Sequence, residues 1–365
     1  MKVIITGAHF TPALAVIEEL KKNRGIEIIY VGRNFTQEGD QTRSQESLII
    51  PGLGVKFINL TAGRLRKDWS FYAIISLLKI PIGFIQAIQI IFREKPDILL
   101  SFGGYVGLPM VVAGWLFSVP IIIHEQTLVS GLTNKICSIF ADKIATSFDN
   151  EKNRSAILTG NPIRQELLKP LKKIKPHFLK LFKYADEHHL PVILAMGGNQ
   201  GSHLINVNIE KSLPNILKIA CIIHISGDSK YRDYEKLKKW EGENYLVEKW
   251  IGQDFGYILS KVDFVVSRAG INSLLEMANF GKPALVIPLP HLYQDEQYVN
   301  ARYFEKLGML KILPQSRLSK ENLVSEIKNM IKNIESLTES AKEAKQIIIP
   351  DAAKRLALET ITLSP

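Results

Sequence analysis

The segment Val192-Ile193-Leu194-Ala195-Met196-Gly197-Gly198-Asn199-Gln200-Gly201-Ser202 decides the fold. Its first five residues form a continuous apolar run, which is typical of a strand buried on both faces, and a helical pattern follows it. Glycines between a strand and a helix let backbone amides approach a ligand, and a helix start favours an anion such as a diphosphate. The glycine spacing differs from the G-x-G-x-x-G dinucleotide pattern, and a structural turn that binds nothing is the alternative.

The same alternation of apolar strands and helices runs along both halves of the chain, which predicts parallel sheets covered on both faces. The predicted strands are Val3–Ile5, Glu27–Val31, Val55–Ile58, Ile98–Ser101, Ile121–His124, Lys143–Ala145, Ala156–Thr159, Val192–Met196, Ala220–Ile225, Tyr245–Glu248, Asp263–Val266 and Ala284–Ile287. The lysine-rich segment 169–183 separates the two series and is interpreted as a connection. We therefore predict an α/β protein with two Rossmann-like doubly wound domains, 1–163 and 164–349, that face an interdomain cleft. We expect a helix at 350–365, capped by Asp351 and with Leu358 on its apolar side, to pack back on the first domain.

Composition excludes several classes of protein. The 365 residues are 46% apolar and 22% charged, which argues against wholesale disorder. The two cysteines, Cys137 and Cys221, are too far apart for a metal motif and too few for a disulfide framework, which favours a reducing compartment. There is no P-loop and no G-x-S-x-G elbow. The net charge of +10 favours nucleic acid, an anionic membrane or a phosphorylated substrate as partner.

The stretch Ser70–Phe92 has the length of a membrane span, but Lys79, Pro81 and Gly83 make it a poor one. We predict a helix from Gly83 to Phe92. The many apolar side chains of Ser70–Phe92 lie near the cations Arg64, Arg66 and Lys67 in the sequence. This combination suits an anionic membrane surface. The alternative is that most of these side chains are buried under the first sheet.

Two polar segments in the second half are candidate sugar-nucleotide contacts. In Ser267–Glu276, Gly270 is placed at the turn after a strand, and Glu276 could accept two ribose hydroxyl protons. The alternative is an ordinary acidic residue near a helix start. The segment His291–Ala301 follows another strand, and its amides and carboxylates suit sugar hydroxyls, although a solvated loop is an equal alternative.

The first half offers three more strand-end motifs. Thr6-Gly7-Ala8-His9 follows the first strand, and the ordinary pKa of histidine, near 6.5, would suit His9 to act as a general base. The alternative is a histidine that caps the next helix. Ser101-Phe102-Gly103-Gly104-Tyr105 is a second glycine-lined turn, and His124-Glu125-Gln126-Thr127 with Gly131-Leu132-Thr133-Asn134-Lys135 is the third motif.

Together these motifs resemble the MurG family, the UDP-N-acetylglucosamine transferases that act on undecaprenyl-linked N-acetylmuramyl pentapeptide. The resemblance covers nearly the whole chain. Besides the segments above it is carried by Pro120, Gly160-Asn161-Pro162-Ile163-Arg164, Gly281-Lys282-Pro283-Ala284 and Asn300-Ala301. It implies a GT-B fold and an inverting transfer of GlcNAc that converts lipid I to lipid II in peptidoglycan synthesis. It further implies UDP-GlcNAc as donor, no metal or other cofactor, no nucleic-acid partner, and a peripheral location on the cytoplasmic face of the bacterial membrane.

The resemblance also implies roles for individual residues. His9 would be the catalytic base, Ile251 would face uracil, Glu276 the ribose, Asn199 and Ser202 the diphosphate, and Glu296 and Gln297 the GlcNAc hydroxyls. The remaining expected substrate-binding residues are Thr6, Gly7, Ala8, Gly104, Tyr105, Glu125, Thr127, Asn134, Arg164, Gln200, Ile271, Asn272 and Ser273.

The chain departs from the family pattern in two places. The family's first loop has the form G-G-T-G-G-H, and we interpret Ile4, Ile5 and Ala8 as replacements of three of its glycines. Thr127 stands where the family has asparagine. Three alternatives stay open. A nucleotide-sugar epimerase and a GT-B transferase with another lipid acceptor share the expected fold, and the altered first loop motivates a non-catalytic membrane-associated binding protein.

Overall fold

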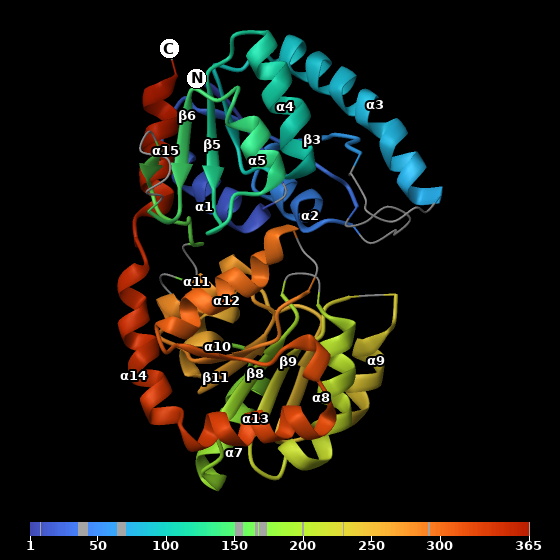
Figure 1. Ribbon diagram of the computed structural model, residues 1–365, viewed down its shortest axis with the longest axis vertical. Coiled ribbons are helices and arrows are strands. Elements are labelled where there is room, and N and C mark those ends of the chain that lie inside the picture. Colours follow the sequence, from blue (N-terminus) through green and yellow to red (C-terminus); the bar gives the residue numbers. More distant parts are fainter. Residues whose placement is uncertain are drawn as a thin grey trace. The chain divides into compact units, whose positions relative to one another are not determined.

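The structure is a computed structural model that describes residues 1–7, 9–35, 43–63, 71–149, 156–164, 167, 174–198, 201–228, 230–290 and 293–364, with the backbone alone at 71–77 and 293. The chain divides into two compact units. The N-terminal unit comprises Met1–Arg164 and Ile349–Pro365, and the C-terminal unit comprises Gln165–Ile348. Figure 1 shows the elements of each unit.

The N-terminal unit is built around a parallel sheet, which in the described residues has seven strands in the order β3-β2-β1-β4-β5-β6-β7. The strands are β1 (Lys2–Thr6), β2 (Glu27–Gly32), β3 (Lys56–Asn59), β4 (Ile98–Ser101), β5 (Ile121–Glu125), β6 (Lys143–Thr146) and β7 (Ile157–Leu158). The helices are α1 (Phe10–Leu20), α2 (Gln45–Gly52), α3 (Phe71–Glu94), α4 (Gly104–Leu116), α5 (Leu132–Cys137) and α15 (Ala352–Leu363). Alternate residues of β1 enter different cores: Val3 and Ile5 pack with α1 and α15, whereas Ile4 packs with α3 and α4.

The C-terminal unit repeats this design with six parallel strands in its described part, in the order β10-β9-β8-β11-β12-β13. The strands are β8 (Val192–Met196), β9 (Cys221–Ile225), β10 (Tyr245–Glu248), β11 (Phe264–Ser267), β12 (Ala284–Val286) and β13 (Leu310–Ile312). The helices are α7 (Pro176–His188), α8 (His203–Ile216), α9 (Asp233–Leu237), α10 (Phe255–Lys261), α11 (Ile271–Asn279), α12 (Glu296–Lys306), α13 (Lys320–Lys332) and α14 (Ile334–Ala344). The predicted class, two doubly wound parallel-sheet domains, is therefore confirmed.

Three local predictions need correction. Residues 176–183 are not part of a connection but belong to α7, because Pro176 starts that helix and Phe178 and Leu181 are buried. Helix α3 begins well before Gly83 and continues through Pro81. In α15, Asp351 precedes the helix but accepts a hydrogen bond from Arg355 instead of capping the helix, and Leu358 is exposed.

Packing of α15 against α1 joins the end of the chain to its first helix, as Figure 1 shows. Ala353 and Leu356 lie in the same core as Val3 and Ile5, and Lys143 of β6 forms an ion pair of 2.6 Å with Glu359. Both cysteines are free and buried, one in each unit. No helix within the described ranges combines the length and the hydropathy needed to cross a bilayer.

Candidate functional site

Each sheet has one place where the direction of strand order reverses, between β1 and β4 in the first and between β8 and β11 in the second. In doubly wound sheets the loops at the carboxyl ends of two such strands diverge and leave a crevice for a ligand. Two sequence motifs of each half fall on these loops: they include residues 7–9 and 102–103 in the N-terminal unit, and 197–202 and 268–270 in the C-terminal unit.

The loop between β1 and α1 has only three residues, 7–9. Gly7 has a φ of +138°, and a Cβ there would lie 2.8 Å from the Phe102 backbone, so no larger residue fits. Thr6 is fully buried, and its hydroxyl donates to the Val31 carbonyl oxygen at 2.9 Å. The Thr6 side chain therefore holds β1 to β2. Ala8 lies outside the described residues.

Our interpretation of Ile4 and Ile5 as replacements of loop glycines is wrong. Both residues lie within β1 and are fully buried in the two cores of the N-terminal unit. Their side chains therefore do not project into the loop. The loop itself comprises residues 7–9, and the replacement of a family glycine by Ala8, which lies outside the described residues, stays a prediction.

His9 precedes α1, and its side chain makes no capping hydrogen bond, so the alternative of a capping histidine is not borne out. His9 as a whole residue is half-buried. Burial, and secondarily the positive charge of Arg33, lowers the pKa of His9 to about 4. The ring is therefore neutral at pH 7 and able to accept a proton. Burial also lowers the pKa of the fully buried His124 to about 4, and the neighbouring His9 adds to this effect.

The turn between β4 and α4 contacts the third motif. Gly103 and Gly104 have φ values of +70° and +73°, and a Cβ on Gly103 would overlap the Asn134 side-chain amide. That amide donates from Nδ2 to Oε2 of the buried Glu125 at 2.9 Å. The Thr127 hydroxyl lies 2.8 Å from Glu125 Oε1. The structure thus brings the turn at Gly104 together with Glu125, Thr127 and Asn134. The Glu125 carboxylate already accepts hydrogen bonds from the side chains of Thr127 and Asn134.

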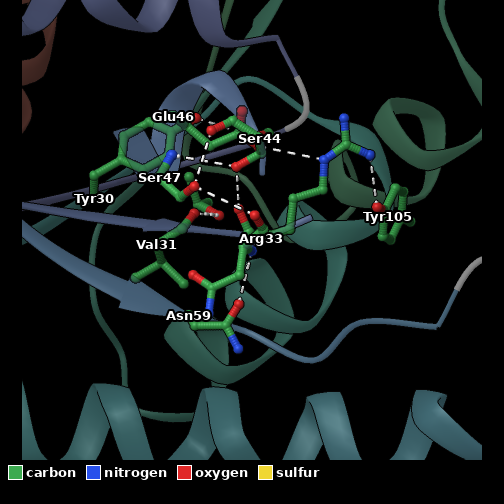
Figure 2. A network of polar contacts seen from close by, with 11 residues as sticks. Tyr30, Val31, Arg33, Ser44, Glu46, Ser47, Asn59 and Tyr105 are labelled. Carbon is green, nitrogen blue, oxygen red and sulfur yellow. Dashed lines mark hydrogen bonds and ion pairs between the residues drawn. The ribbon is translucent and has the colours of Figure 1, made fainter. Parts of the chain in front are cut away.

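Arg33, which our sequence reasoning missed, extends across this region (Figure 2). Its Nη1 donates to the Tyr105 hydroxyl at 2.8 Å, and its Nε lies 3.3 Å from Oε1 of the buried Glu46. Glu46 sits in the first turn of α2, which Ser44 caps by accepting from the Ser47 amide. Its position in the sequence could have indicated a role at the site. Arg33 directly follows β2, and a charged residue directly after a strand lies at the edge of the sheet where ligands bind.

The loop between β8 and α8 lies directly against the loop after β9. Gly201, with a φ of +76°, is so close to the Ser226 carbonyl oxygen that a Cβ would overlap it. Ser202 precedes α8, and its side chain makes no capping hydrogen bond. Asn199 and Gln200 lie outside the described residues.

A buried polar network fixes the start of α8. Asn206 donates to the Ser226 carbonyl oxygen at 2.9 Å and to Asp233 at 3.0 Å. Asp233 also contacts His203 Nδ1 at 2.8 Å. His224 bridges Asn206 and the Tyr245 hydroxyl, and burial lowers its pKa to about 3. A neutral ring there is consistent with one donated and one accepted hydrogen bond.

The start of α11 has the features of an anion site. Gly270 precedes it, no side chain caps it, and its first turn (Ile271, Asn272 and Ser273) contains no acidic residue. The first backbone amides of a helix have no partner within the helix. Glu276 lies farther along the same helix and is buried. Ile251 follows β10 and is half-buried.

Gln297 of α12 organises two neighbouring loops. Its Oε1 accepts from the Leu289 amide at 2.9 Å and from the Ala269 amide at 3.3 Å. Its Nε2 is the remaining donor. Glu296 begins the same helix, and Arg164 is the last residue of the N-terminal unit's first segment. Among the described side chains, no group of three or more His, Cys, Asp or Glu residues is arranged to hold a metal ion.

Comparison with known proteins decides the family. Residues 3–146 match the glycosyltransferase family 28 N-terminal domain, and residues 192–356 match its C-terminal domain. A UDP-N-acetylglucosamine–N-acetylmuramyl-(pentapeptide) pyrophosphoryl-undecaprenol N-acetylglucosamine transferase from Clostridium botulinum is 35% identical over 341 residues, which is 91% of each chain. The chain belongs to the MurG family. The predicted resemblance is thereby confirmed.

Solved structures agree on the fold. Acinetobacter baumannii MurG superposes with a TM-score of 0.71 at 24% identity and 99% coverage of both chains. A UDP-GlcNAc 2-epimerase from Neisseria meningitidis, solved with UDP-GlcNAc bound, gives a TM-score of 0.62 at 18% identity, covering 99% of this chain and 100% of that one. The MurG family thus shares its GT-B architecture with epimerases, and the fold by itself does not select the reaction.

Proposed function

We propose that this chain transfers GlcNAc from UDP-GlcNAc to undecaprenyl-diphospho-N-acetylmuramyl pentapeptide, the step that forms lipid II for peptidoglycan and so supports cell shape and division. The observation that carries this proposal is family membership over nearly the full length, with the family's motifs on the loops of both sheet switch points. We infer that residues 1–163, with the helix at 350–365, hold the acceptor. Residues 164–349 would hold the donor.

In this scheme the acceptor hydroxyl attacks C1 of GlcNAc while the bond from C1 to the UDP oxygen breaks, which inverts the configuration. His9 takes the hydroxyl proton, since its lowered pKa keeps the ring neutral at pH 7. UDP leaves with the bonding electron pair. The amides at the start of α11 and in the loop before α8 would stabilise the charge that develops on the diphosphate.

The donor contacts follow from the same loops. Glu276 would accept the ribose hydroxyls, and Ile251 would present its backbone to uracil. Gln297 would offer Nε2 to a GlcNAc hydroxyl, because its Oε1 already holds two backbone amides. The scheme needs no metal ion, and the donor is a substrate rather than a cofactor.

We further propose that the N-terminal unit binds the cytoplasmic face of the membrane. Gly83, Ala87 and Ile91 of α3 face the core, whereas Leu78, Ile85 and Phe92 are 65%, 57% and 64% exposed. Phe117, at the end of α4, continues this apolar surface, with its ring centroid 6.3 Å from that of Phe92. Arg64, Arg66 and Lys67, which the sequence places near it, lie outside the described residues.

Vesicle sedimentation tests the membrane proposal. We expect binding to vesicles of anionic phospholipid to exceed binding to zwitterionic ones, and Ile85→Glu to weaken both. Leu358→Glu is the matched control, because Leu358 is also 57% exposed but lies on α15. Equal losses in the two variants would reject α3 as the membrane-binding face.

Turnover tests the reaction. UDP release from UDP-GlcNAc should require a polyprenyl-diphosphate-linked muramyl pentapeptide. Conversion of UDP-GlcNAc without an acceptor would instead indicate the epimerase, and release that needs a different lipid-linked sugar would change the acceptor. Donor binding without any turnover would favour the non-catalytic alternative, for which the short loop at residues 7–9 is the motive.

A further inference from the structure

The Arg33–Tyr105 hydrogen bond has a fixed direction. A guanidinium has five N–H groups and no acceptor, so Arg33 Nη1 must donate and the Tyr105 oxygen must accept. The guanidinium carbon also lies 5.7 Å from the centre of the Tyr105 ring. A phenol has one proton of its own. No residue in the described part of the chain accepts that proton, so it remains available to a ligand.

Arg33 is itself held in place from the opposite side. Its Nε contacts Glu46 of α2, whose side chain is only 8% exposed, and Arg33 therefore spans from α2 to the second residue of α4. Figure 2 shows the side chain extended between these two partners. Tyr105 follows Gly103 and Gly104, two residues without side chains, and no side chain caps the start of α4. Arg33 thus gives the residue after these two glycines a side-chain contact that the turn itself does not provide.

A charged donor on the phenol oxygen also alters the O–H group. Hydrogen bonds polarise one another in a chain, so a phenol that accepts from a cation becomes a stronger donor through its own proton. The half-buried Tyr105 is at the carboxyl edge of β4, beside the loop that carries His9. The charge of Arg33 acts on that histidine as well.

We propose that Arg33 is a positioning residue for the acceptor: it fixes Tyr105 and directs the Tyr105 proton toward an oxygen of the acceptor substrate. This inference rests on the proposed function, because it takes the N-terminal unit as the acceptor side. Arg33 acts through Tyr105 and need not touch the substrate itself.

A double-mutant cycle tests the proposal. The variants are Arg33→Met, Tyr105→Phe and their combination, and the measurement is the affinity for a short-chain polyprenyl-diphosphate muramyl pentapeptide by calorimetry, together with KM for donor and acceptor. We expect Arg33→Met to weaken acceptor binding about 10-fold, as loss of a charged hydrogen bond does, and to leave the donor KM unchanged. In the Tyr105→Phe background the same substitution should cost less than about 2-fold.

Two further variants separate this role from a structural one. Lys56→Met removes an exposed cation of the same unit that is paired with Glu94 at 2.8 Å, and it should leave acceptor binding unchanged. Arg33→Lys keeps a charged donor and should lose less acceptor affinity than Arg33→Met. The lysine variant also tests the proposal if Arg33→Met does not fold. Additive losses in the cycle, or an equal rise in the donor KM, would overturn the role of Arg33. If the wild-type chain binds no such acceptor, the proposed function fails with it.

Discussion

The low pKa of His9 makes a prediction that separates this histidine from an ordinary one. The ordinary pKa of histidine is 6.5, and burial with the Arg33 charge lowers it to about 4. At pH 5.5 an ordinary histidine would be about 90% protonated, whereas His9 would be only about 3% protonated. If His9 is the base, kcat/KM for the acceptor at pH 5.5 should remain close to its value at pH 7, instead of falling about 10-fold.

The assay is the initial rate of UDP release at low acceptor concentration from pH 4 to 8, with circular dichroism at each pH to confirm that the chain is folded. Protonation should remove activity only as the pH approaches 4. Arg33→Met should move this acidic limb upward but not to 6.5, because the charge is the smaller of the two causes and burial remains. His9→Ala should abolish the limb and most of the rate while donor affinity is kept. A wild-type limb near pH 6.5 would refute either the buried setting of His9 or its role as the base.

Three other predictions concern binding and stability. Glu276→Ala should weaken UDP binding by about 1–3 kcal/mol by calorimetry, and Glu276→Gln should show how much of this depends on charge, while unchanged affinity would reject the ribose assignment. Gly7→Ala should lower the free energy of unfolding in urea by several times the roughly 1 kcal/mol expected for Gly25→Ala. Both glycines have a positive φ, but only at Gly7 would the added Cβ meet other atoms within 4 Å. His124 and His224 are buried with pKa values of about 4 and 3, so the unfolded chain binds more protons below pH 6.5. The free energy of unfolding should therefore fall by about 2 kcal/mol for each from pH 7 to pH 5, and a flat profile would contradict this.

The architecture could be read from the sequence because it depends on short-range patterns. A run such as Val192–Met196 is apolar at every position, which is typical of a strand covered on both faces. Helix boundaries were harder, because tertiary packing overrides local signals. We predicted that this helix starts at Gly83, yet α3 begins earlier and runs through Pro81, and Gly83, Ala87 and Ile91 bury one of its faces. The lysines of 169–183 suggested a solvated connection, yet Phe178 and Leu181 anchor α7.

The site could be predicted only as far as single loops. Strand-end motifs predicted which segments lie at the carboxyl edge of each sheet, because the carboxyl ends of parallel strands share one edge. Pairings between distant side chains left no such pattern. Arg33 contacts Glu46, 13 positions away, and Tyr105, 72 positions away. The sequence likewise could not indicate that the Thr6 hydroxyl is bonded to Val31, since that bond depends on the register of β1 with β2.

If the N-terminal unit holds the anionic acceptor, as we propose, the three-residue loop between β1 and α1 limits how it can do so. A glycine-rich loop offers several backbone amides to a diphosphate, but only three positions separate β1 from α1, and Gly7 is packed against Phe102. Under this proposal, side chains and the start of α4 would supply further donors to the acceptor. Arg33 is a cation at this edge of the sheet, it is joined to Tyr105, and its charge acts on His9. Removing the Arg33 charge should therefore alter both acceptor binding and the protonation of His9. Loss of an arginine with a purely structural role would not produce these two effects together.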